Sequence, residues 1–458
     1  MKGLTLEKIT AVCGGTYYGN KEDLSKEIDS VTTDSRKAEK GSLFAAIRGE
    51  RVDGHSFIPQ VFKAGALCVI SEQELPAAGG NYILVKSTLD ALKAIAEEYL
   101  KQLRIPVVGI AGSVGKTSTK EMIASVLSQK YRVLKTAGNF NNELGLPLTI
   151  FRIREEDEIA VLEMGISDFG EMHRLAKIAR PDTCVMTNIG YCHLEFLGDR
   201  DGVLKAKSEI FDFLKPDGYI VLNGDDDKLR TIKEKNGIAP VFFGIDEKND
   251  LYARNIEKKG LDGISCEICT GQGSFTALIP IPGRHMVYNA LAGCAVGLHY
   301  GLSLEEIKAG IESLQSLAGR FNILRTDKYT LIDDCYNANP MSMKASLEAL
   351  NEALGRKAAI LGDMGELGED EVSLHYQVGQ FAAGLNLDLC ICIGPLSKNI
   401  AKGMRDSGSS ARIVELENTE ELLSSLDQYL QPQDTILVKA SHFMHFEKVV
   451  EGVKNCIS

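Results

Sequence analysis

Residues 107–120 limit the possible folds of this chain more than any other stretch does. The segment reads Val-Val-Gly-Ile-Ala-Gly-Ser-Val-Gly-Lys-Thr-Ser-Thr-Lys, which is an apolar run typical of a buried strand, a glycine-rich loop and the start of a helical pattern. In that order, the backbone N–H groups of the loop converge on phosphate oxygens at the N-terminus of the helix. The segment therefore predicts a phosphate-binding loop after a parallel strand.

The loop provides the first candidate ligands for a nucleoside triphosphate. Lys116 would place a positive charge on the outer phosphates, and the Thr117 hydroxyl can bind Mg2+. The usual spacing G-x-x-x-x-G-K-[ST] is not met, because Ile110 stands where the first glycine belongs. A glycine-rich turn with a surface lysine is the structural alternative. The candidate nucleotide-binding residues of the loop are Gly112, Ser113, Gly115, Lys116, Thr117 and Ser118.

The composition narrows the class of protein. With 458 residues the chain is too long for one ordinary core, so roughly two to four domains are expected. A net charge of −12 argues against a nucleic-acid partner. No stretch resembles a signal peptide or a membrane span, so we expect a cytoplasmic protein without membrane insertion. The eleven cysteines are scattered, which favours reduced thiols, and Cys266-x-x-Cys269 lacks the second pair of a zinc site.

The hydrophobic pattern predicts three α/β domains. Residues 1–104 contain short strands and helices without a phosphate loop of their own. In residues 105–318 strands alternate with helices, which predicts a central, mostly parallel sheet with helices on both faces. Within this domain, residues 250–282 alternate like antiparallel strands. Residues 319–458 form another strand–helix series without a G-x-G-x-x-G turn, which predicts a Rossmann-like domain to which no dinucleotide is assigned.

Polar side chains follow the apolar runs of the central domain. Glu163 ends the run 159–162, where a carboxylate beside the phosphate loop is well placed to hold Mg2+. His193 lies on the loop after the next run, which favours a functional histidine over a structural one. Lys207 lies on a following helix, where a solvated lysine is the alternative. Asp225-Asp226-Asp227 is interpreted as a turn with a helix cap in preference to a metal cluster.

Three further places could contact a ligand. Asn289 lies on the first turn of a long apolar helix and could bind the edge of a base or cap the helix. Ser35 and Arg36 lie on a loop suited to a diphosphate or a uracil edge, with a solvated loop as the alternative. Arg320 follows Gly319 at the joint into the last domain.

In chain order these residues resemble the Mur ligases, the ATP-dependent amide-bond ligases of peptidoglycan precursor synthesis. The motifs common to the family are Gly112–Thr117, Glu163-Met-Gly165, Asn188-Ile-Gly190 with His193, Ala206-Lys207, Asn289 and Arg320. Three longer motifs, at 138–149, 333–340 and 361–368, resemble the branch that joins D-alanyl-D-alanine to UDP-N-acetylmuramoyl-tripeptide. In the last domain, Ala440 and His442 stand where the family often has Gly and Arg.

The resemblance implies roles for the residues of the phosphate site. Lys116, Glu163, His193 and Lys207 are expected to be catalytic. Thr117 and Glu163 would bind one Mg2+ together with ATP, and His193 would bind a second with Lys207 as its carbamate, an anionic oxygen ligand. Beyond the loop, the contacts to ATP would come from Asn289, Arg320 and Asp334.

The resemblance also implies substrates and a reaction. The first domain would hold the UDP end of UDP-N-acetylmuramoyl-tripeptide near Ser35 and Arg36. The peptide and D-alanyl-D-alanine would contact Asn141, Asn142, Tyr336, Asn337 and Asn339. Because a carboxylate is a poor acyl donor, ATP would first convert it to an acyl phosphate, which the amine then attacks. We expect a monomer; the alternatives are a related ligase acting on another acid, such as a folylpolyglutamate synthase, and an ATP-hydrolysing regulator.

Overall fold

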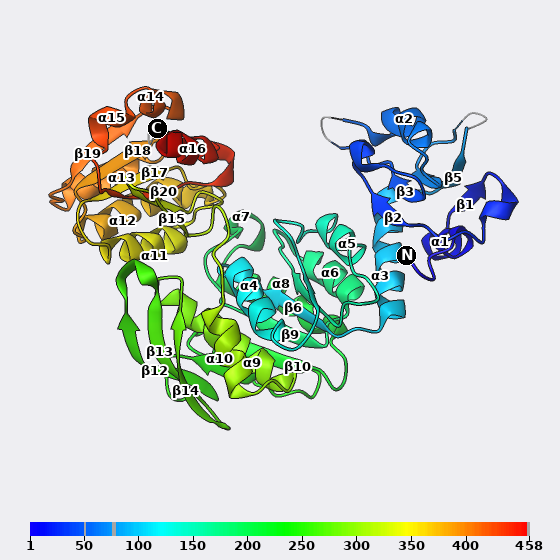
Figure 1. The fold of residues 1–458 in the computed structure, drawn as a ribbon, viewed down its shortest axis with the longest axis horizontal. Coiled ribbons are helices and arrows are strands. Elements are labelled where there is room, and N and C mark those ends of the chain that lie inside the picture. Colours follow the sequence, from blue (N-terminus) through cyan, green and yellow to red (C-terminus); the bar gives the residue numbers. More distant parts are fainter. Residues whose placement is uncertain (50–51, 76–78, 456–458) are drawn as a thin grey trace.

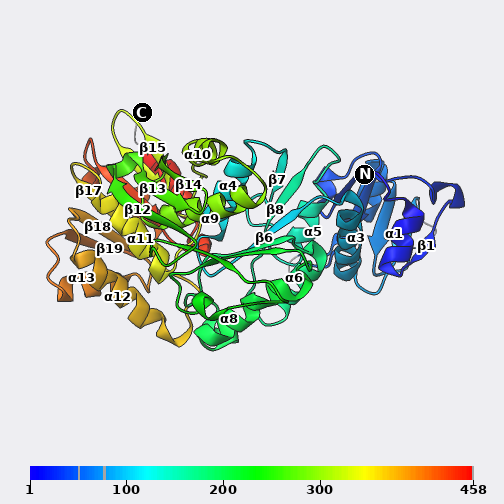
Figure 2. The ribbon, with the colours of Figure 1, turned by 90° about the horizontal axis from the view of Figure 1, so that it is seen from below.

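The computed structural model describes residues 1–49, 52–75 and 79–455. Residues 456–458, which the sequence assigns to the third domain, lie outside the described residues. Figure 1 shows three α/β units in chain order, coloured blue, cyan to green, and yellow to red. Figure 2 shows the N-terminal unit at one end of the molecule and the C-terminal unit at the other. The predicted fold class of three α/β domains around a phosphate-loop sheet is confirmed.

The N-terminal unit is built on a five-stranded sheet in the order β1-β5-β4-β3-β2. Its strands are parallel except β1, which runs antiparallel to β5. The strands are β1 (Thr16–Tyr18), β2 (Ser30–Thr32), β3 (Ser42–Ala45), β4 (Cys68–Ser71) and β5 (Asn81–Leu84). The helices are α1 (Leu6–Cys13), α2 (Ile58–Lys63) and α3 (Thr88–Leu103).

The central unit contains a nine-stranded sheet in the order β14-β13-β12-β11-β10-β9-β6-β8-β7. It is parallel from β7 to β12, while β13 and β14 form antiparallel pairs at its edge, as predicted for residues 250–282. Its strands are β6 (Val107–Ala111), β7 (Val133–Lys135), β8 (Ile159–Glu163), β9 (Thr183–Met186), β10 (Tyr219–Asn223), β11 (Val241–Gly244), β12 (Leu251–Lys258), β13 (Ile264–Thr270) and β14 (Gly273–Ile279). Its helices are α4 (Lys116–Leu127), α5 (Gly145–Ile150), α6 (Glu171–Ala179), α7 (Leu194–Leu197), α8 (Arg200–Ser208), α9 (His285–His299) and α10 (Leu304–Glu312).

The C-terminal unit has a six-stranded sheet in the order β15-β16-β20-β17-β18-β19, in which only β15 is antiparallel to its neighbour. Its strands are β15 (Asn322–Arg325), β16 (Thr330–Asp333), β17 (Lys357–Gly362), β18 (Leu389–Ile393), β19 (Arg412–Leu416) and β20 (Thr435–Lys439). Its helices are α11 (Pro340–Asn351), α12 (Glu371–Ala383), α13 (Lys398–Asp406), α14 (Thr419–Leu423), α15 (Leu426–Tyr429) and α16 (Glu447–Asn455).

The phosphate loop follows from its local sequence. All residues of β6 are buried, and Gly112 (φ 148°) and Gly115 (φ 79°) then turn the chain into α4. A Cβ atom at Gly112 would collide with the Thr187 hydroxyl, so this position requires glycine. The first turn of α4 therefore begins at the carboxyl end of the parallel strands.

At each of the two joints, an apolar cluster continues from one unit into the next. Helix α3 packs against α1 of the N-terminal unit and against α5 and α6 of the central unit, and the Tyr99 hydroxyl donates a 2.8 Å hydrogen bond to the Ile153 carbonyl. At the second joint, one apolar cluster continues from α4 and α9 into α11, where Met343 and Leu347 are buried. The central and C-terminal units therefore share a core.

Two expectations from the composition can be compared with the structure. The described cysteines are free thiols, and most of them are buried. Over residues 1–49, 52–75 and 79–455, no helix combines the length and the apolar character that a bilayer span needs.

Candidate active site

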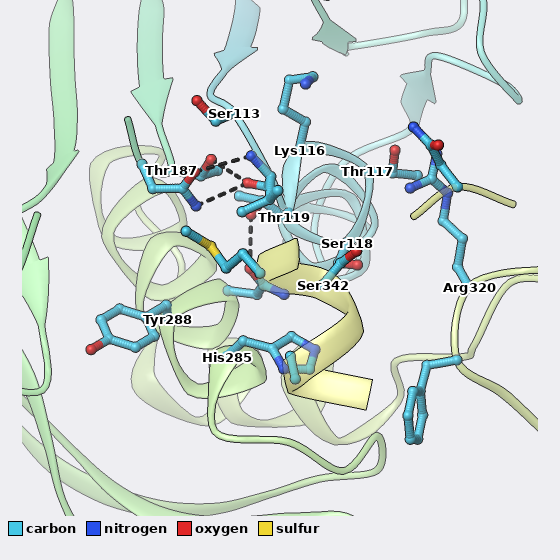
Figure 3. A pocket seen from close by; sticks show the side chains of 18 of the residues that line it. Ser113, Lys116, Thr117, Ser118, Thr119, Thr187, His285, Tyr288, Arg320 and Ser342 are labelled. Carbon is cyan, nitrogen blue, oxygen red and sulfur yellow. Dashed lines mark hydrogen bonds between the residues drawn. The ribbon is translucent and has the colours of Figure 1, made fainter. Parts of the chain in front are cut away.

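The carboxyl ends of the central strands open into a cavity of ≈ 720 Å³ that two units share. The central unit contributes the phosphate loop, Glu163 and the start of α9, and the C-terminal unit contributes Arg320, Asp334 and Lys439. A cavity of this size suits a ligand as large as a nucleotide. Figure 3 shows residues from both sides, among them Lys116, Thr117, Ser118, His285, Tyr288, Arg320 and Ser342.

The phosphate loop is held by the segment that follows β9. Asn188 Oδ1 accepts a hydrogen bond from the Val114 N–H, and Asn188 Nδ2 donates to the Val114 carbonyl, both at 3.0 Å. The Thr187 hydroxyl donates to the same carbonyl at 2.6 Å, and the Ser113 N–H donates to the Asn188 carbonyl at 3.0 Å. These bonds fix the backbone of the loop from one side and leave the other side facing the cavity.

Thr117 and Glu163 meet at the start of α4. The Thr117 hydroxyl lies 3.0 and 3.2 Å from the two carboxylate oxygens of Glu163, and Asn141 Nδ2 donates to Glu163 Oε1 at 3.0 Å. On the same turn, Lys116 Nζ donates a 2.9 Å hydrogen bond to the Gly112 carbonyl. No group of three or more His, Cys, Asp and Glu side chains in the described parts of the chain could hold a metal alone. The hydroxyl and carboxylate oxygens nevertheless fit Mg2+ if a triphosphate provides further oxygens.

His193 and Lys207 are perturbed by burial and by neighbouring charges. Lys207 is fully buried on α8, and burial together with the charge of Lys116 lowers its pKa to about 8. Burial, followed by the charges of Lys207 and Lys116, lowers the pKa of His193 to about 4. His193 Nδ1 lies 3.4 Å from Glu366 Oε2 of the C-terminal unit. A neutral imidazole can bind a metal, and a neutral amine is the form of lysine that can react with carbon dioxide.

Apolar and aromatic side chains line the cavity beyond the loop. Phe243 from β11 and Met286 and Tyr288 from α9 belong to this wall. Asn289 is buried there: its Oδ1 accepts a 2.8 Å hydrogen bond from the Thr119 hydroxyl, and its Nδ2 lies 3.2 Å from the Met286 sulfur. The side chain therefore connects α9 to α4 and does not cap α9. An apolar wall with an amide group at its edge suits a purine base.

A buried ion pair forms part of the C-terminal wall. Lys439 Nζ lies 2.6 Å from Asp334 Oδ2 and donates to the Asn337 carbonyl at 3.1 Å. Asp334 also accepts hydrogen bonds from the Phe321 N–H (3.0 Å) and from the Ser346 hydroxyl (2.5 Å). Since the carboxylate is bonded on both oxygens, the position of the Lys439 ammonium is fixed.

Arg320 lies beside this pair. Its guanidinium group lies 4.0 Å from the centre of the Tyr336 ring, and the same ring meets His442 edge to face at 5.6 Å. Gly319 has φ 73°, and a Cβ atom there would lie 3.2 Å from Tyr336 Cβ. The aromatic ring therefore packs closely on the turn that carries the arginine.

Comparisons with known proteins agree with this geometry. Three family models match the chain: Mur ligase family, catalytic domain, over residues 27–109; Mur ligase middle domain over 110–297; and Mur ligase, glutamate ligase domain, over 319–442. The UDP-N-acetylmuramoyl-tripeptide–D-alanyl-D-alanine ligase of Bacillus subtilis (strain 168) is 38% identical over 98% of this chain and 98% of its own length. The chain belongs to the Mur ligase family.

Solved structures of Mur ligases resemble this chain over almost its whole length. A crystal structure of MurF from Acinetobacter baumannii has a TM-score of 0.89 and 33% identity and covers 98% of both chains. The MurF ligase from Thermotoga maritima in complex with ADP has a TM-score of 0.82 and 31% identity, covering 93% of this chain and 97% of that one. The resemblance therefore extends to how the three units are arranged.

The predicted substrate residues of this Mur ligase differ in their surroundings. Asn141, Asn337 and Asn339 line the cavity. Asn339 Oδ1 also caps α11 by accepting from the Ser342 N–H at 2.9 Å, and Asn337 Oδ1 accepts from the next backbone N–H at 2.8 Å. Asn142 Oδ1 accepts from the Gly145 N–H at 2.8 Å at the start of α5. Asn142, Asn337 and Asn339 therefore each have a local structural role, and their role in substrate binding stays a prediction.

Ser35 and Arg36 lie apart from the cavity, in the N-terminal unit, on the 3-10 turn Ser35–Lys37. Arg36 donates two 2.8 Å hydrogen bonds to the two oxygens of Asp34. These hydrogen bonds lower the pKa of Asp34 to about 2. The Arg36 side chain is 84% exposed, so the Mur ligase presents it on the surface of a different unit from the phosphate loop.

Sequence reasoning missed two buried lysines of this Mur ligase and the role of Asn188. Lys439 could have been found, because it ends the apolar strand β20 as Glu163 ends β8. Lys120 has no local signal in the sequence, yet its side chain is fully buried, with Nζ 3.7 Å from Glu163 Oε2. The interpretation of residues 225–227 as a turn and cap is confirmed, because Asp226 Oδ1 accepts from two backbone N–H groups that follow it.

Proposed function

We propose that this protein is the ATP-dependent ligase that joins D-alanyl-D-alanine to UDP-N-acetylmuramoyl-tripeptide in peptidoglycan synthesis, with release of ADP and phosphate. The observation that carries the proposal is the shared cavity, which Lys116, Thr117 and Glu163 of the central domain line together with Arg320 and Lys439 of the C-terminal domain. The similarity to UDP-N-acetylmuramoyl-tripeptide–D-alanyl-D-alanine ligases over nearly the whole chain supports the choice of substrates.

The first step brings two anions together. A carboxylate oxygen of the tripeptide attacks the γ-phosphorus of ATP, the bond to ADP breaks, and an acyl phosphate forms. Lys116 on the loop and Arg320 on the C-terminal wall carry positive charges that reduce the repulsion between the two reactants. Lys439 offers a further ammonium group at the same cavity, and its ion pair with Asp334 holds it in position.

Magnesium would be held by the Thr117 hydroxyl and the Glu163 carboxylate, where it would neutralise charge on the phosphates. We place a second ion at His193 and at a carbamate of Lys207. The lowered pKa values of both side chains support this assignment. Near neutral pH, the imidazole is uncharged and part of the Lys207 population is a neutral amine.

In the second step the amine nitrogen of D-alanyl-D-alanine attacks the acyl carbon, the C–O bond to phosphate breaks, and the nitrogen loses a proton. No protein nucleophile is needed. Closure at the joints near Pro106 and Gly319 would keep water from the acyl phosphate. The peptide and amine would contact Asn141, Asn142, Tyr336, Asn337 and Asn339.

The remaining assignments concern the whole chain. Residues 1–104 would bind the UDP end through Ser35 and Arg36, residues 105–318 would bind ATP, and residues 319–458 would bind the dipeptide and part of ATP. These boundaries lie in the connections after α3 and after α10.

The cysteines bear on the location of the protein. Free, mostly buried cysteines support a reducing, cytoplasmic location. We expect a monomer, which light scattering in solution would test.

The test measures phosphate release from ATP and Mg2+ with both substrates present and with each omitted, and it identifies the product by mass. Release that requires both substrates, with a product enlarged by the dipeptide, supports the proposal. Lys116→Ala should abolish release while thermal unfolding stays normal, because within the described parts of the chain the lysine side chain forms one hydrogen bond, to its own loop. Phosphate release without the amine, or a dipeptide that is never joined, would refute the assignment of substrates.

A further inference from the structure

Lys120 is a buried cation behind the phosphate site. It lies on α4 one turn after Lys116, and its side chain is 1% exposed. Its Nζ lies 3.2 Å from Glu121 Oε1 and 3.7 Å from Glu163 Oε2. Among the residues that the structure describes, this ammonium has no hydrogen-bond partner of good geometry. Burying an ammonium group is unfavourable unless nearby charges compensate it. The question is therefore which negative charge compensates the ammonium group of Lys120.

Pairing with Glu121 alone does not account for Lys120. Glu121 already forms an ion pair with Lys135, a half-exposed lysine at the end of β7. Charges of alternating sign therefore run inward from Lys135 through Glu121 and Lys120 to Glu163. With Glu121 balanced by Lys135, the charge that Lys120 balances is that of Glu163.

Among the described residues, Lys120 forms the one ion pair of Glu163. Its hydrogen bonds come from the Thr117 hydroxyl and the Asn141 amide, which are neutral donors. Within the described residues, Lys120 is the one ammonium or guanidinium group in ion-pair range of this carboxylate. Thr117 and Glu163 line the cavity, while Lys120 lies outside its lining. The lysine can therefore act on a ligand only through the carboxylate and through its charge.

We propose that Lys120 is a positioning residue that balances the charge of Glu163, so that the Thr117–Glu163 pair accepts a divalent cation together with a nucleotide but holds the cation only weakly without one. A positive charge behind the carboxylate repels a free divalent cation and attracts a triphosphate. The loop thus selects the metal–nucleotide complex over its parts. This inference rests on the proposed binding of ATP and Mg2+ at Thr117 and Glu163.

The test measures Mn2+ binding by electron paramagnetic resonance, first without nucleotide, and then measures the affinity for a non-hydrolysable ATP analogue. In Lys120→Met, which keeps the length of the stem, the affinity for free Mn2+ should rise about tenfold and the affinity for the analogue should fall about tenfold. Opposite shifts distinguish a charge effect from a loosened structure, since a loosened site would weaken both. Lys135→Met removes the same charge farther from Glu163 and should change neither affinity by more than about twofold.

A second variant tests whether misfolding could explain the result. Lys120→Met with Glu121→Gln removes one buried charge of each sign, so the net charge is unchanged, and the only ion pair lost besides those of Lys120 is the half-exposed pair of Glu121 with Lys135 among the described residues. This double variant should unfold at nearly the wild-type temperature and should keep the opposite shifts. Shifts that vanish in it, or two affinities that fall together, overturn the inference. If the wild-type protein binds no Mn2+ even with the analogue, the proposed metal role is overturned together with this inference. If the wild-type protein binds Mn2+ and Lys120→Met binds it with the same affinities, only this inference is overturned.

Discussion

At the scale of single residues, the site depends on charges whose surroundings differ from those of ordinary surface groups. Lys116 lies over its own loop with a 2.9 Å bond to Gly112, whereas Lys207 is fully buried beside it and has its pKa lowered to about 8. Two lysines close together in space therefore have different chemistry. Lys116 lines the cavity, where it can contact phosphates, and the buried Lys207 can lose its proton.

Lys207→Ala tests the proposed carbamate. Removing the amine should abolish ligation, and a small carboxylate such as formate should restore part of it, because it can occupy the space of the lost group and offer the same oxygen ligands. Phosphate release measured against formate concentration provides the readout. Lys205→Ala, on the same helix but exposed beside Phe169, should remain active and should not respond to formate. Full activity of Lys207→Ala without formate would show that no carbamate is used.

Asn188→Ala tests the residue that holds the phosphate loop. The change removes two side-chain bonds to Val114, which should cost about 1–2 kcal/mol of nucleotide binding and raise the KM for ATP roughly tenfold, with a smaller change in kcat. Steady-state kinetics at saturating second and third substrates separate the two constants. Asn399→Ala on α13, which also loses a side-chain bond to a carbonyl, should leave the KM for ATP unchanged. An unaltered KM in Asn188→Ala would mean that the loop keeps its shape without this amide.

At the scale of helices and strands, an ionic cluster joins the first two units. Glu143 lies at the start of α5, 2.9 Å from Lys93 of α3, and Arg174 of α6 donates to both of its oxygens. Burial alone would raise the pKa of Glu143, but the hydrogen bonds from Arg174 and Lys93 outweigh it and leave the pKa below 4.5. Three elements from two units therefore meet at one carboxylate.

Glu143→Gln should lower the free energy of unfolding by about 1 kcal/mol at neutral pH, a modest value because Arg174 is half-exposed. A lowered pKa in the folded state means that this stabilisation is complete above about pH 4.5 and is lost as the pH falls through the folded-state pKa. Urea unfolding at neutral and at acidic pH should show the difference between variant and wild type shrinking in acid. Glu257→Gln, which breaks an exposed pair with Lys259, should have little effect at either pH.

The sequence predicts the elements of this fold better than it predicts the contacts between them. Apolar runs ended by glycines or carboxylates, such as β6 and β8, identify their strands locally. Lys120 could not be found in this way, because its reason for being buried is Glu163, which belongs to a different strand. The pairing of Asp334 with Lys439 likewise joins residues 105 positions apart. Charges that are balanced only in the folded chain leave no local pattern.

At the scale of the whole molecule, the N-terminal unit lies at one end and contacts the central unit through α3. Figures 1 and 2 show it beside the central unit, with α3 between them and the C-terminal unit at the far side. Arg104 adopts φ 54° directly after α3, just before Pro106. We expect the hinge of the N-terminal unit at this short connection.

Small-angle X-ray scattering tests the closure. The radius of gyration should fall when UDP-N-acetylmuramoyl-tripeptide and a non-hydrolysable ATP analogue are added together, because the proposed binding of the UDP end by the N-terminal unit makes the substrate span from that unit to the phosphate loop. ADP alone should produce little change. A radius of gyration that stays constant with both ligands would show that the free protein already has the arrangement it needs for ligation.

The division of the cavity between two domains also bears on how the cell's ATP is used. Arg320 and Lys439 belong to a different domain from the phosphate loop, so the loop by itself lacks the cations of the opposite wall. We therefore expect ATP that is bound by the loop alone to be held without being activated, with slow hydrolysis by water. Hydrolysis of ATP without ligation would then be limited, because the positive charges of both walls surround the γ-phosphate only when the two domains enclose it.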